Sequence, residues 1–254
     1  MKRGLEWAQR VRPLERQHLP PALQRLEGLT VWKLPQPGEP YVMGTDCAQG
    51  GREGDASCSI VLAARTLEHV ATMHGRWEPD YFGEQSVELG LAYGKALWGV
   101  ENAPQGHGHT VLALARRLGY PRLFWHPVAD PTLGRAVAPF GAQAQEATRR
   151  LGWVTSTRTK TGLIYDLAAA IVSAALVSYD AEFWGECLTY TITYTEHGRA
   201  IAGALSGCHD DRVMAMAIAR QMAMQPGASV LRPAIPAASP LATSLRDGTA
   251  GGMP

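Results

Sequence analysis

The chain has 254 residues with 46% hydrophobic content and a formal net charge of +1. This length and apolar content suffice for one substantial α/β domain with extensions. A net charge so close to zero does not indicate a nucleic-acid binder, so any such surface would have to come from local clusters of Lys and Arg. No stretch approaches the ~20 apolar residues of a membrane span, and residues 1–9 lack the apolar core of a signal peptide. We therefore expect a soluble protein that is not secreted.

The composition divides the chain into three regions. Residues 1–40 are rich in Arg, Gln and Pro, and we expect a basic lead-in with room for one short helix. Residues 41–225 alternate apolar segments with polar breaks, which is typical of a folded domain. Residues 226–254 are rich in Pro, Ala, Gly and Ser with almost no large apolar side chains, so we expect a flexible tail.

The first elements of the domain have strand character. Three apolar or β-branched segments follow one another with short breaks, at residues 41–47, 57–64 and 68–75. Consecutive strands with short connections favour an antiparallel meander. A Gly-rich loop, residues 49–54, separates the first two. Residues 81–97 then show apolar spacing closer to a helix than to a strand.

The pattern next changes to an alternation of strands and helices. A strand is expected at 97–100, a helix at 110–118 and a strand at 122–125, and this order implies a parallel crossover. Further on, the sequence predicts a helix at 161–176, a turn at 197–199 and a last helix at 210–224. Residues 188–195 alternate Thr with apolar residues, which fits either an ordinary edge strand or a hairpin beside a site. The edge strand is favoured.

Cysteines and paired histidines give no sign of a zinc site. The four cysteines are widely separated, at Cys47, Cys58, Cys187 and Cys208. They include no Cys-x-x-Cys pair, so we expect reduced intracellular thiols. His107 and His109 have a spacing that invites a metal interpretation, but they lie in a Gly-rich turn just before a helix. The turn interpretation is favoured over contact with a ligand.

Acidic residues occupy three positions where α/β sheets commonly place their sites. Asp46 ends the first strand, Glu101 ends the fourth, and Asp210 and Asp211 begin the last helix. Any one of them alone is explained as a strand end or a helix cap. Together, carboxylates from three distant segments are what a site for hard divalent cations needs, and two such ions can activate water and clamp a phosphodiester.

The order of four motifs resembles the nuclease domain found at the C-terminal end of phage large terminase subunits. The motifs are GTDCAQGGREGDASCSIV, VENAPQGHG, TSTRTKTGLIYDL and GCHDDRVMAMAIA, and the resemblance spans about residues 41–225. The last motif is the most specific of the four. The resemblance implies an α/β, RNase H-like fold, with a mixed sheet of a three-stranded antiparallel meander plus parallel strands, flanked by helices.

The resemblance also assigns roles to residues. It implies that the metal ligands and catalytic residues are Asp46, Glu101, Asp210 and Asp211, and that the supporting residues are Asp55, Asn102, Lys160 and His209. Lys160 would face DNA or help to order the site, and His209 would either assist the metal site or cap the helix. The implied reaction is hydrolysis of DNA with two Mg²⁺ or Mn²⁺ ions and little sequence preference.

DNA contacts are expected from cations near the acidic motifs, because phosphate contacts dominate non-specific binding. The candidates are Arg149, Arg150, Arg158, Lys160 and Arg212. Tryptophans in apolar runs are better explained by core packing than by base stacking. These are Trp77, Trp98, Trp125, Trp153 and Trp184.

Large terminases carry an ATPase motor ahead of the nuclease, and this sequence has none. Its nearest approach to a phosphate-binding loop, residues 90–95, is one residue short and lacks Ser or Thr after Lys95. The family implies double-stranded DNA, a terminase ATPase domain or subunit, portal and small terminase as partners, in the cytoplasm of an infected bacterial host. Two alternatives stay open: a Holliday-junction resolvase of the same fold, and a non-catalytic DNA-binding or packaging-motor module.

Overall fold

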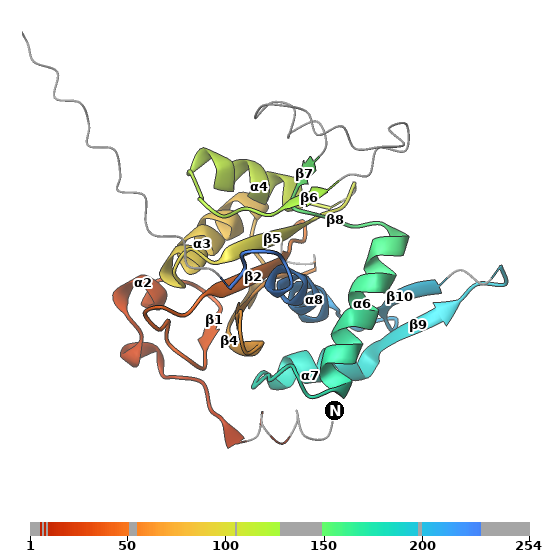
Figure 1. The fold of residues 1–254 in the computed structure, drawn as a ribbon, viewed down its shortest axis with the longest axis horizontal. Helices are drawn as coiled ribbons and strands as arrows, with labels where there is room; N and C mark the ends of the chain where they lie inside the picture. Colours follow the sequence, from red (N-terminus) through yellow and green to blue (C-terminus); the bar gives the residue numbers. More distant parts are fainter. Residues whose placement is uncertain are drawn as a thin grey trace, which may run out of the picture.

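A six-stranded mixed sheet lies at the centre of the protein, in the order β1-β4-β3-β2-β5-β8 (Figure 1). The computed structural model describes residues 6, 8, 10–50, 55–104, 106–127, 149–197 and 200–229, without the side chains of residues 157 and 158. The strands of this sheet are β1 (Leu29–Val31), β2 (Tyr41–Asp46), β3 (Ser57–Ala63), β4 (Glu68–Gly75), β5 (Leu97–Asn102) and β8 (Trp153–Val154). Among the described residues, no helix has the length and apolar character that crossing a bilayer requires.

The strand directions confirm the expected mixed sheet. β2, β3 and β4 form an antiparallel meander, and β1 adds to its edge through antiparallel pairing with β4. On the other side β5 runs parallel to β2, and β8 runs parallel to β5. Two further pairs of strands lie outside this sheet. They are β6 (Trp125–Pro127) with β7 (Arg149–Leu151), and β9 (Tyr190–Tyr194) with β10 (Ala200–Ala204).

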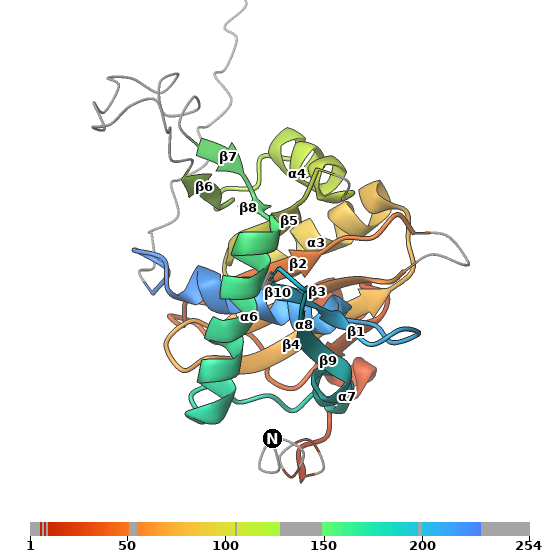
Figure 2. The same cartoon turned by 90° about the vertical axis from the view of Figure 1, so that its right-hand side faces the viewer.

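Helices cover both faces of the sheet (Figures 1 and 2). One face packs against α3 (Pro79–Ala92) and α4 (Gly108–Arg117), and Trp98 is fully buried in that layer. The other face packs against α8 (Asp211–Ala223), with α6 (Thr157–Val172) and α7 (Ala181–Thr189) outside it. Trp184 is buried in this second layer, so core packing accounts for both of these tryptophans.

Glycines let α8 lie unusually close to the sheet. A Cβ atom added at Gly44 in β2 would stand 2.2 Å from the carbonyl oxygen of Ala215 and 2.2 Å from the backbone nitrogen of Ala219. In β5, a Cβ at Gly99 would stand 2.7 Å from the sulfur of Met222. The small side chains of α8 match these glycines. This contact fixes the helix over β2 and β5, and so sets the position of its N-terminus.

Part of the basic lead-in packs into the same core. It contains the short η1 (Arg16–His18) and α2 (Pro21–Gln24) and the edge strand β1. Its buried side chains are Leu19, Leu23, Leu26, Val31 and Trp32. The segments on either side of the expected boundary at residue 41 therefore lie together. The sequence did not indicate this, because a three-residue strand between Pro-rich stretches has too little apolar pattern to be recognised. Of the expected tail, residues 230–254 lie outside the described residues.

Several helix boundaries differ from those expected, for reasons of capping and backbone geometry. α6 begins at Thr157 instead of Thr161, because the Ser156 side chain caps it and exchanges hydrogen bonds with Thr159. α3 ends at Ala92, ahead of Gly94 and Lys95, whose φ angles are 65° and 61°. α7 was not predicted; Asp180 caps it by accepting hydrogen bonds from the next turn.

Two strand predictions need correction. The segment expected at residues 188–195 is not an edge strand of the main sheet. Its β9 pairs with β10 in a separate hairpin, because the small apolar residues 200–204 supply a partner strand after the turn. The strand expected at 122–125 is reduced to a single bridge, between Leu123 and Trp98, and the regular strand β6 begins at Trp125.

Candidate active site

Four acidic residues lie where β2 and β5 end and α8 begins. Asp46 is the last residue of β2. Glu101 is the second-last residue of the neighbouring β5, and it follows Val100, which pairs with Thr45 of β2. Asp210 is the N-cap residue of α8 and Asp211 is its first residue. Because α8 is held over β2 by close packing, its first residues come to the same end of the sheet.

The carboxylates interact strongly with one another. Asp46 and Glu101 lie close enough for their side chains to interact directly. The pKa of Asp46 is raised well above its usual value, first by burial, then by the negative charge of Glu101 and more weakly by those of Asp211 and Asp210. The site therefore concentrates more negative charge than its surroundings neutralise, which is the condition that a divalent cation would relieve.

The donor set suits a hard divalent cation. It consists of carboxylate oxygens, and the Oδ2 atom of Asp211 is buried without a hydrogen-bond partner in the described part of the chain. In this conformation, however, no three His, Cys, Asp or Glu side chains among the described residues stand close enough to hold one ion. Binding of a cation would therefore have to draw the four carboxylates closer together.

One lysine and two histidines lie beside acidic side chains at this end of the sheet. Lys160, in the first turn of α6, places its Nζ atom 3.3 Å from Oδ2 of Asp210. His74, near the end of β4, places Nε2 3.7 Å from Oδ2 of Asp211. His209 places Nδ1 3.9 Å from Oδ1 of Asp55, and both of those side chains are more than half exposed. The expected supporting residues Lys160, His209 and Asp55 thus lie at the acidic end of the sheet, whereas His74 was not anticipated.

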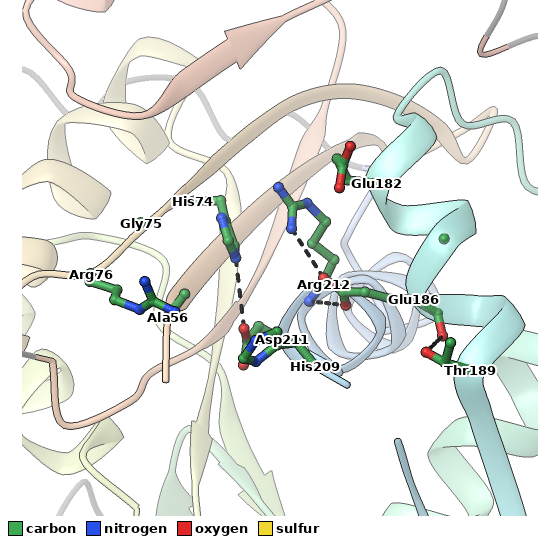
Figure 3. Close-up of a pocket in the computed structure, with 11 residues that line it drawn as sticks. Ala56, His74, Gly75, Arg76, Glu182, Glu186, Thr189, His209, Asp211 and Arg212 are labelled. Atoms are coloured by element: carbon green, nitrogen blue, oxygen red, sulfur yellow. Dashed lines mark hydrogen bonds and ion pairs between the residues drawn. The ribbon is translucent and has the colours of Figure 1, made fainter. Parts of the chain in front are cut away.

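A cavity of about 570 Å³ opens beside Asp211 (Figure 3). Its lining contains the cations Arg76 and Arg212, the acidic Glu182 and Glu186, and the imidazoles of His74 and His209. The wall of the cavity is formed by the start of β3, the end of β4, the start of α8 and one side of α7. The cavity is large enough for a group of nucleotide size and has the acidic end of α8 in its wall.

Arg212 has a structural contact instead of a free DNA-facing position. Its Nη1 atom donates to Glu186 at 3.1 Å, and its Nε atom lies 3.5 Å from Asp180. Glu186 also accepts from the backbone N–H groups of Arg212 and Val213, at 2.8 and 3.2 Å, and so caps α8. We correct the assignment of Arg212 to DNA accordingly: its guanidinium joins α8 to α7. Glu186 could not be found from sequence, because it comes from an unpredicted helix.

The remaining predicted residues lie around this centre. Asn102 donates from Nδ2 to the carbonyl oxygen of Leu151 at 2.8 Å, which holds the end of β5 to the strand beyond it. Arg149 and Arg150 are exposed on β7, and the side chain of Arg158 lies outside the described residues. His109 donates from Nδ1 to the carbonyl oxygen of Gly106 at 3.1 Å, which ties the first turn of α4 to the loop before it.

Tyr190 is a third residue that the sequence did not single out. It begins β9, and its hydroxyl oxygen is buried without a hydrogen-bond partner among the described residues. Burial raises the pKa of Tyr190, and the charges of Asp210, Glu101 and Asp46 raise it further. The base of the β9–β10 hairpin therefore lies beside the carboxylates.

The sheet order and the helix positions together define an RNase H-like fold. Solved structures of the same fold include the large terminase nuclease from thermophilic phage G20c with bound magnesium, which is 19% identical over 86% of this chain and 94% of that chain, with a TM-score of 0.57. Another structure of the phage G20c nuclease is 19% identical over 86% of this chain and 97% of that one, with a TM-score of 0.53. The Thermus phage P74-26 large terminase nuclease domain is 20% identical over 86% and 94%, with a TM-score of 0.54.

The sequence matches no family model. It also matches no curated protein. The likeness is thus one of structure, and it confirms the expected resemblance to large terminase nucleases at the level of the fold. It spans nearly the whole of each of these nuclease domains.

Proposed function

We propose that this chain is a metal-dependent DNA endonuclease of viral genome packaging, which cuts concatemeric DNA with little sequence preference. The observation that supports this most is the meeting of Asp46, Glu101 and the pair Asp210 and Asp211 at one end of the sheet, with the raised pKa of Asp46 as the sign of their proximity. Metal-bound structures of the phage G20c nuclease, with magnesium, cobalt or zinc, add support from the same fold.

The four carboxylates would hold two Mg²⁺ or Mn²⁺ ions. Asp46 ends β2, next to the strand that carries Glu101 and under the start of α8, so it would be a ligand shared by both parts of the site. Asp46 would bind the metal in its ionised form, since a ligating carboxylate must be ionised. When bound, the metal would activate a water molecule as the nucleophile and stabilise charge on the phosphate oxygens.

The neighbouring residues would orient the ligands. Lys160 is close enough to Asp210 to fix its carboxylate and to balance one negative charge while the site is being filled. Asn102 holds the end of β5 that carries Glu101. Asp55 and His209 are both exposed beside the four carboxylates, where they would contact bound DNA or solvent.

DNA contacts would come from cations near this end. Lys160 lies at the site itself, and Arg149 and Arg150 lie exposed on β7. Such side chains would bind phosphates and not base edges, which is why little sequence preference is proposed. By analogy with the family, the partners would be a terminase ATPase domain or subunit, the portal and the small terminase, in the cytoplasm of an infected bacterium.

The test is cleavage of supercoiled plasmid by the purified chain in Mn²⁺, Mg²⁺ or EDTA. We expect nicking and linearisation that require the metal. Asp46→Asn, Asp210→Asn and Glu101→Gln should each lower the rate by at least about 100-fold, since even residues that only orient metal ligands commonly cost 10–100-fold. Glu88→Gln is the matched control, because Glu88 is exposed on α3 at the opposite face and should leave the rate unchanged.

Other outcomes would separate the alternatives. Preferential cutting of four-way junctions would indicate a resolvase instead of a packaging nuclease. Binding of DNA in mobility-shift experiments without cleavage in either metal, even with an ATPase partner added, would contradict the proposal and favour a non-catalytic module.

A further inference from the structure

His74 belongs to a row of residues that crosses the sheet toward the acidic centre. Asp46 in β2 pairs with Cys58 in β3, and Cys58 pairs with His74 in β4. Residues directly opposite one another in antiparallel strands share a face of the sheet. Cys58 is buried in the layer that α8 covers, so His74 faces the same layer as Asp46, two strands away. The sheet thus brings His74 to the start of α8 from the side opposite Glu101.

Two buried polar atoms face each other at this point. Nε2 of His74 and Oδ2 of Asp211 are 3.7 Å apart, and neither has a hydrogen-bond partner among the described residues. The exposed fractions of the two side chains are 24% and 10%. A buried donor or acceptor without a partner costs on the order of 1–3 kcal/mol. A small approach of the two side chains would form a hydrogen bond and remove that cost. Figure 3 shows the imidazole pointing from β4 to the carboxylate.

The position of His74 is fixed by its backbone. Its N–H donates to the carbonyl oxygen of Gly28 at 3.1 Å. A Cβ at Gly28 would stand 2.4 Å from the carbonyl oxygen of His74, and a Cβ at Gly75 would stand 2.5 Å from the ring of Trp77. Close packing on both sides leaves the strand no room to move. Asp211, at the first turn of a helix capped by Glu186, is held as firmly.

Other charged groups around the imidazole do not replace this contact. The cavity wall near His74 also contains Arg76, His209, Arg212 and Glu186. Arg212 and Glu186 are paired with each other, and His209 lies near Asp55. Among the ion pairs found in the described residues, His74 has Asp211 as its partner.

We propose that His74 is a positioning residue for the metal site, donating an Nε2–H hydrogen bond to Oδ2 of Asp211 and thereby aiming Oδ1 at the cation. The inference rests on the proposed function, because it assigns Asp211 to the metal. Partners of this kind fix the orientation of ligating carboxylates, and their loss typically lowers metal affinity or activity by 10–100-fold. His74 itself touches neither the metal nor the DNA in this role.

The experiment measures Mn²⁺ affinity by electron paramagnetic resonance, with the full chain and no DNA. His74→Leu keeps the size of the side chain and removes the donor, so we expect Kd for Mn²⁺ to rise by roughly 10–100-fold. His74→Gln carries an amide N–H near the position of Nε2 and should restore most of the affinity. His74→Asn places its amide nearer to the strand and should not. Urea unfolding in EDTA identifies any variant that is only misfolded.

A double-mutant cycle and a kinetic measurement complete the test. In an Asp211→Asn background, His74→Leu should have little further effect on Kd, because the two residues act as one unit. At saturating Mn²⁺, His74→Leu should lower kcat for plasmid cleavage and leave KM for DNA unchanged.

Three results would overturn the inference while leaving the proposed function intact. They are wild-type Mn²⁺ affinity in a folded His74→Leu variant, the same loss of affinity with and without Asp211, and a His74→Gln variant as weak as His74→Leu, which would indicate direct ligation by the imidazole. A wild-type chain that binds no Mn²⁺ and cuts no DNA would overturn both.

Discussion

His69 lies at the centre of a buried hydrogen-bond network behind the acidic site. Its Nδ1 atom is 2.8 Å from the hydroxyl of Ser178, and its Nε2 atom is 2.8 Å from the hydroxyl of Thr72, which donates to Asp180. Because Thr72 donates onward, it accepts from the imidazole, and the hydrogen is assigned to Nε2 of His69. Asp180 is also an ion-pair partner of Arg212, so this network supports the start of α8.

This buried histidine should make the protein sensitive to mild acid. Burial lowers the pKa of His69 from 6.5 to about 4. Between these values the unfolded chain binds a proton that the folded chain does not, so stability is full above pH 6.5 and falls as the pH drops toward 4. At ~1.4 kcal/mol per pKa unit, the loss is about 3 kcal/mol. Urea unfolding at pH 7 and pH 4.5 measures it.

The control separates His69 from the carboxylates that titrate in the same range. His69→Gln should be less stable than the wild type at pH 7, but it should lose less stability on acidification. His18→Gln serves as the matched change, since His18 is largely exposed. Equal acid sensitivity in the wild type and in His69→Gln would contradict the prediction.

Asp46 should show the opposite trend in metal-free protein. Burial, and then Glu101, raise its pKa above the usual 3.8. For a carboxyl group whose folded pKa is raised, stability is lost as the pH rises from the unfolded value through the folded one. Asp46→Asn should therefore stabilise the protein in EDTA at pH 7 by roughly 0.5–2 kcal/mol, as replacements at strained sites commonly do. The gain should shrink toward pH 4, and a loss of stability at pH 7 would contradict it.

At the scale of elements, the contact between α8 and β2 positions Asp210 and Asp211 of the candidate site. Gly44→Ala would insert a Cβ against the backbone of α8, with the nearest atoms of Ala215 and Ala219 both at 2.2 Å. Backbone cannot yield as a flexible side chain does, so we expect a loss of about 3 kcal/mol, at the upper end of overpacking costs. The helix would also shift, so plasmid cleavage should fall with stability.

The matched control is the same change at an open position. A Cβ at Gly162 in α6 meets no heavy atom within 4 Å in the described part of the chain. Gly162→Ala should instead stabilise the helix by roughly 0.5–1 kcal/mol. Denaturant unfolding of both variants checks the contrast. A Gly44→Ala variant as stable as the wild type would mean that α8 does not lie this close to the sheet.

At the scale of the whole molecule, metal binding should raise the free energy of unfolding. A cation that binds only the folded chain adds RT ln(1 + [L]/Kd), which is about 2.7 kcal/mol at a concentration of 100 Kd. For a chain of this size that corresponds to a rise in Tm of roughly 5–10 °C. Thermal unfolding in Mn²⁺ against EDTA at equal ionic strength measures it. Asp210→Asn should abolish most of the rise, and an equal rise in that variant would place the metal elsewhere.

The sequence determined the architecture of the domain and the acidic part of the site. Apolar segments of strand length in close succession define the β2–β4 meander, and the later alternation of strand and helix defines the parallel crossover, because both are local patterns. Asp46, Glu101, Asp210 and Asp211 stand at the ends of these elements, so locating the elements located the acids.

Tertiary structure alone decided the rest, because the remaining features depend on contacts between segments distant in sequence. His74 reaches Asp211 through strand register. Arg212 pairs with Glu186, which belongs to a helix whose pattern is too short to be predicted. The hairpin partner of β9 and the packing of the lead-in depend likewise on surfaces that exist only in the folded chain. Periodicity reports which face of an element is apolar, whereas register and helix docking report which side chains meet.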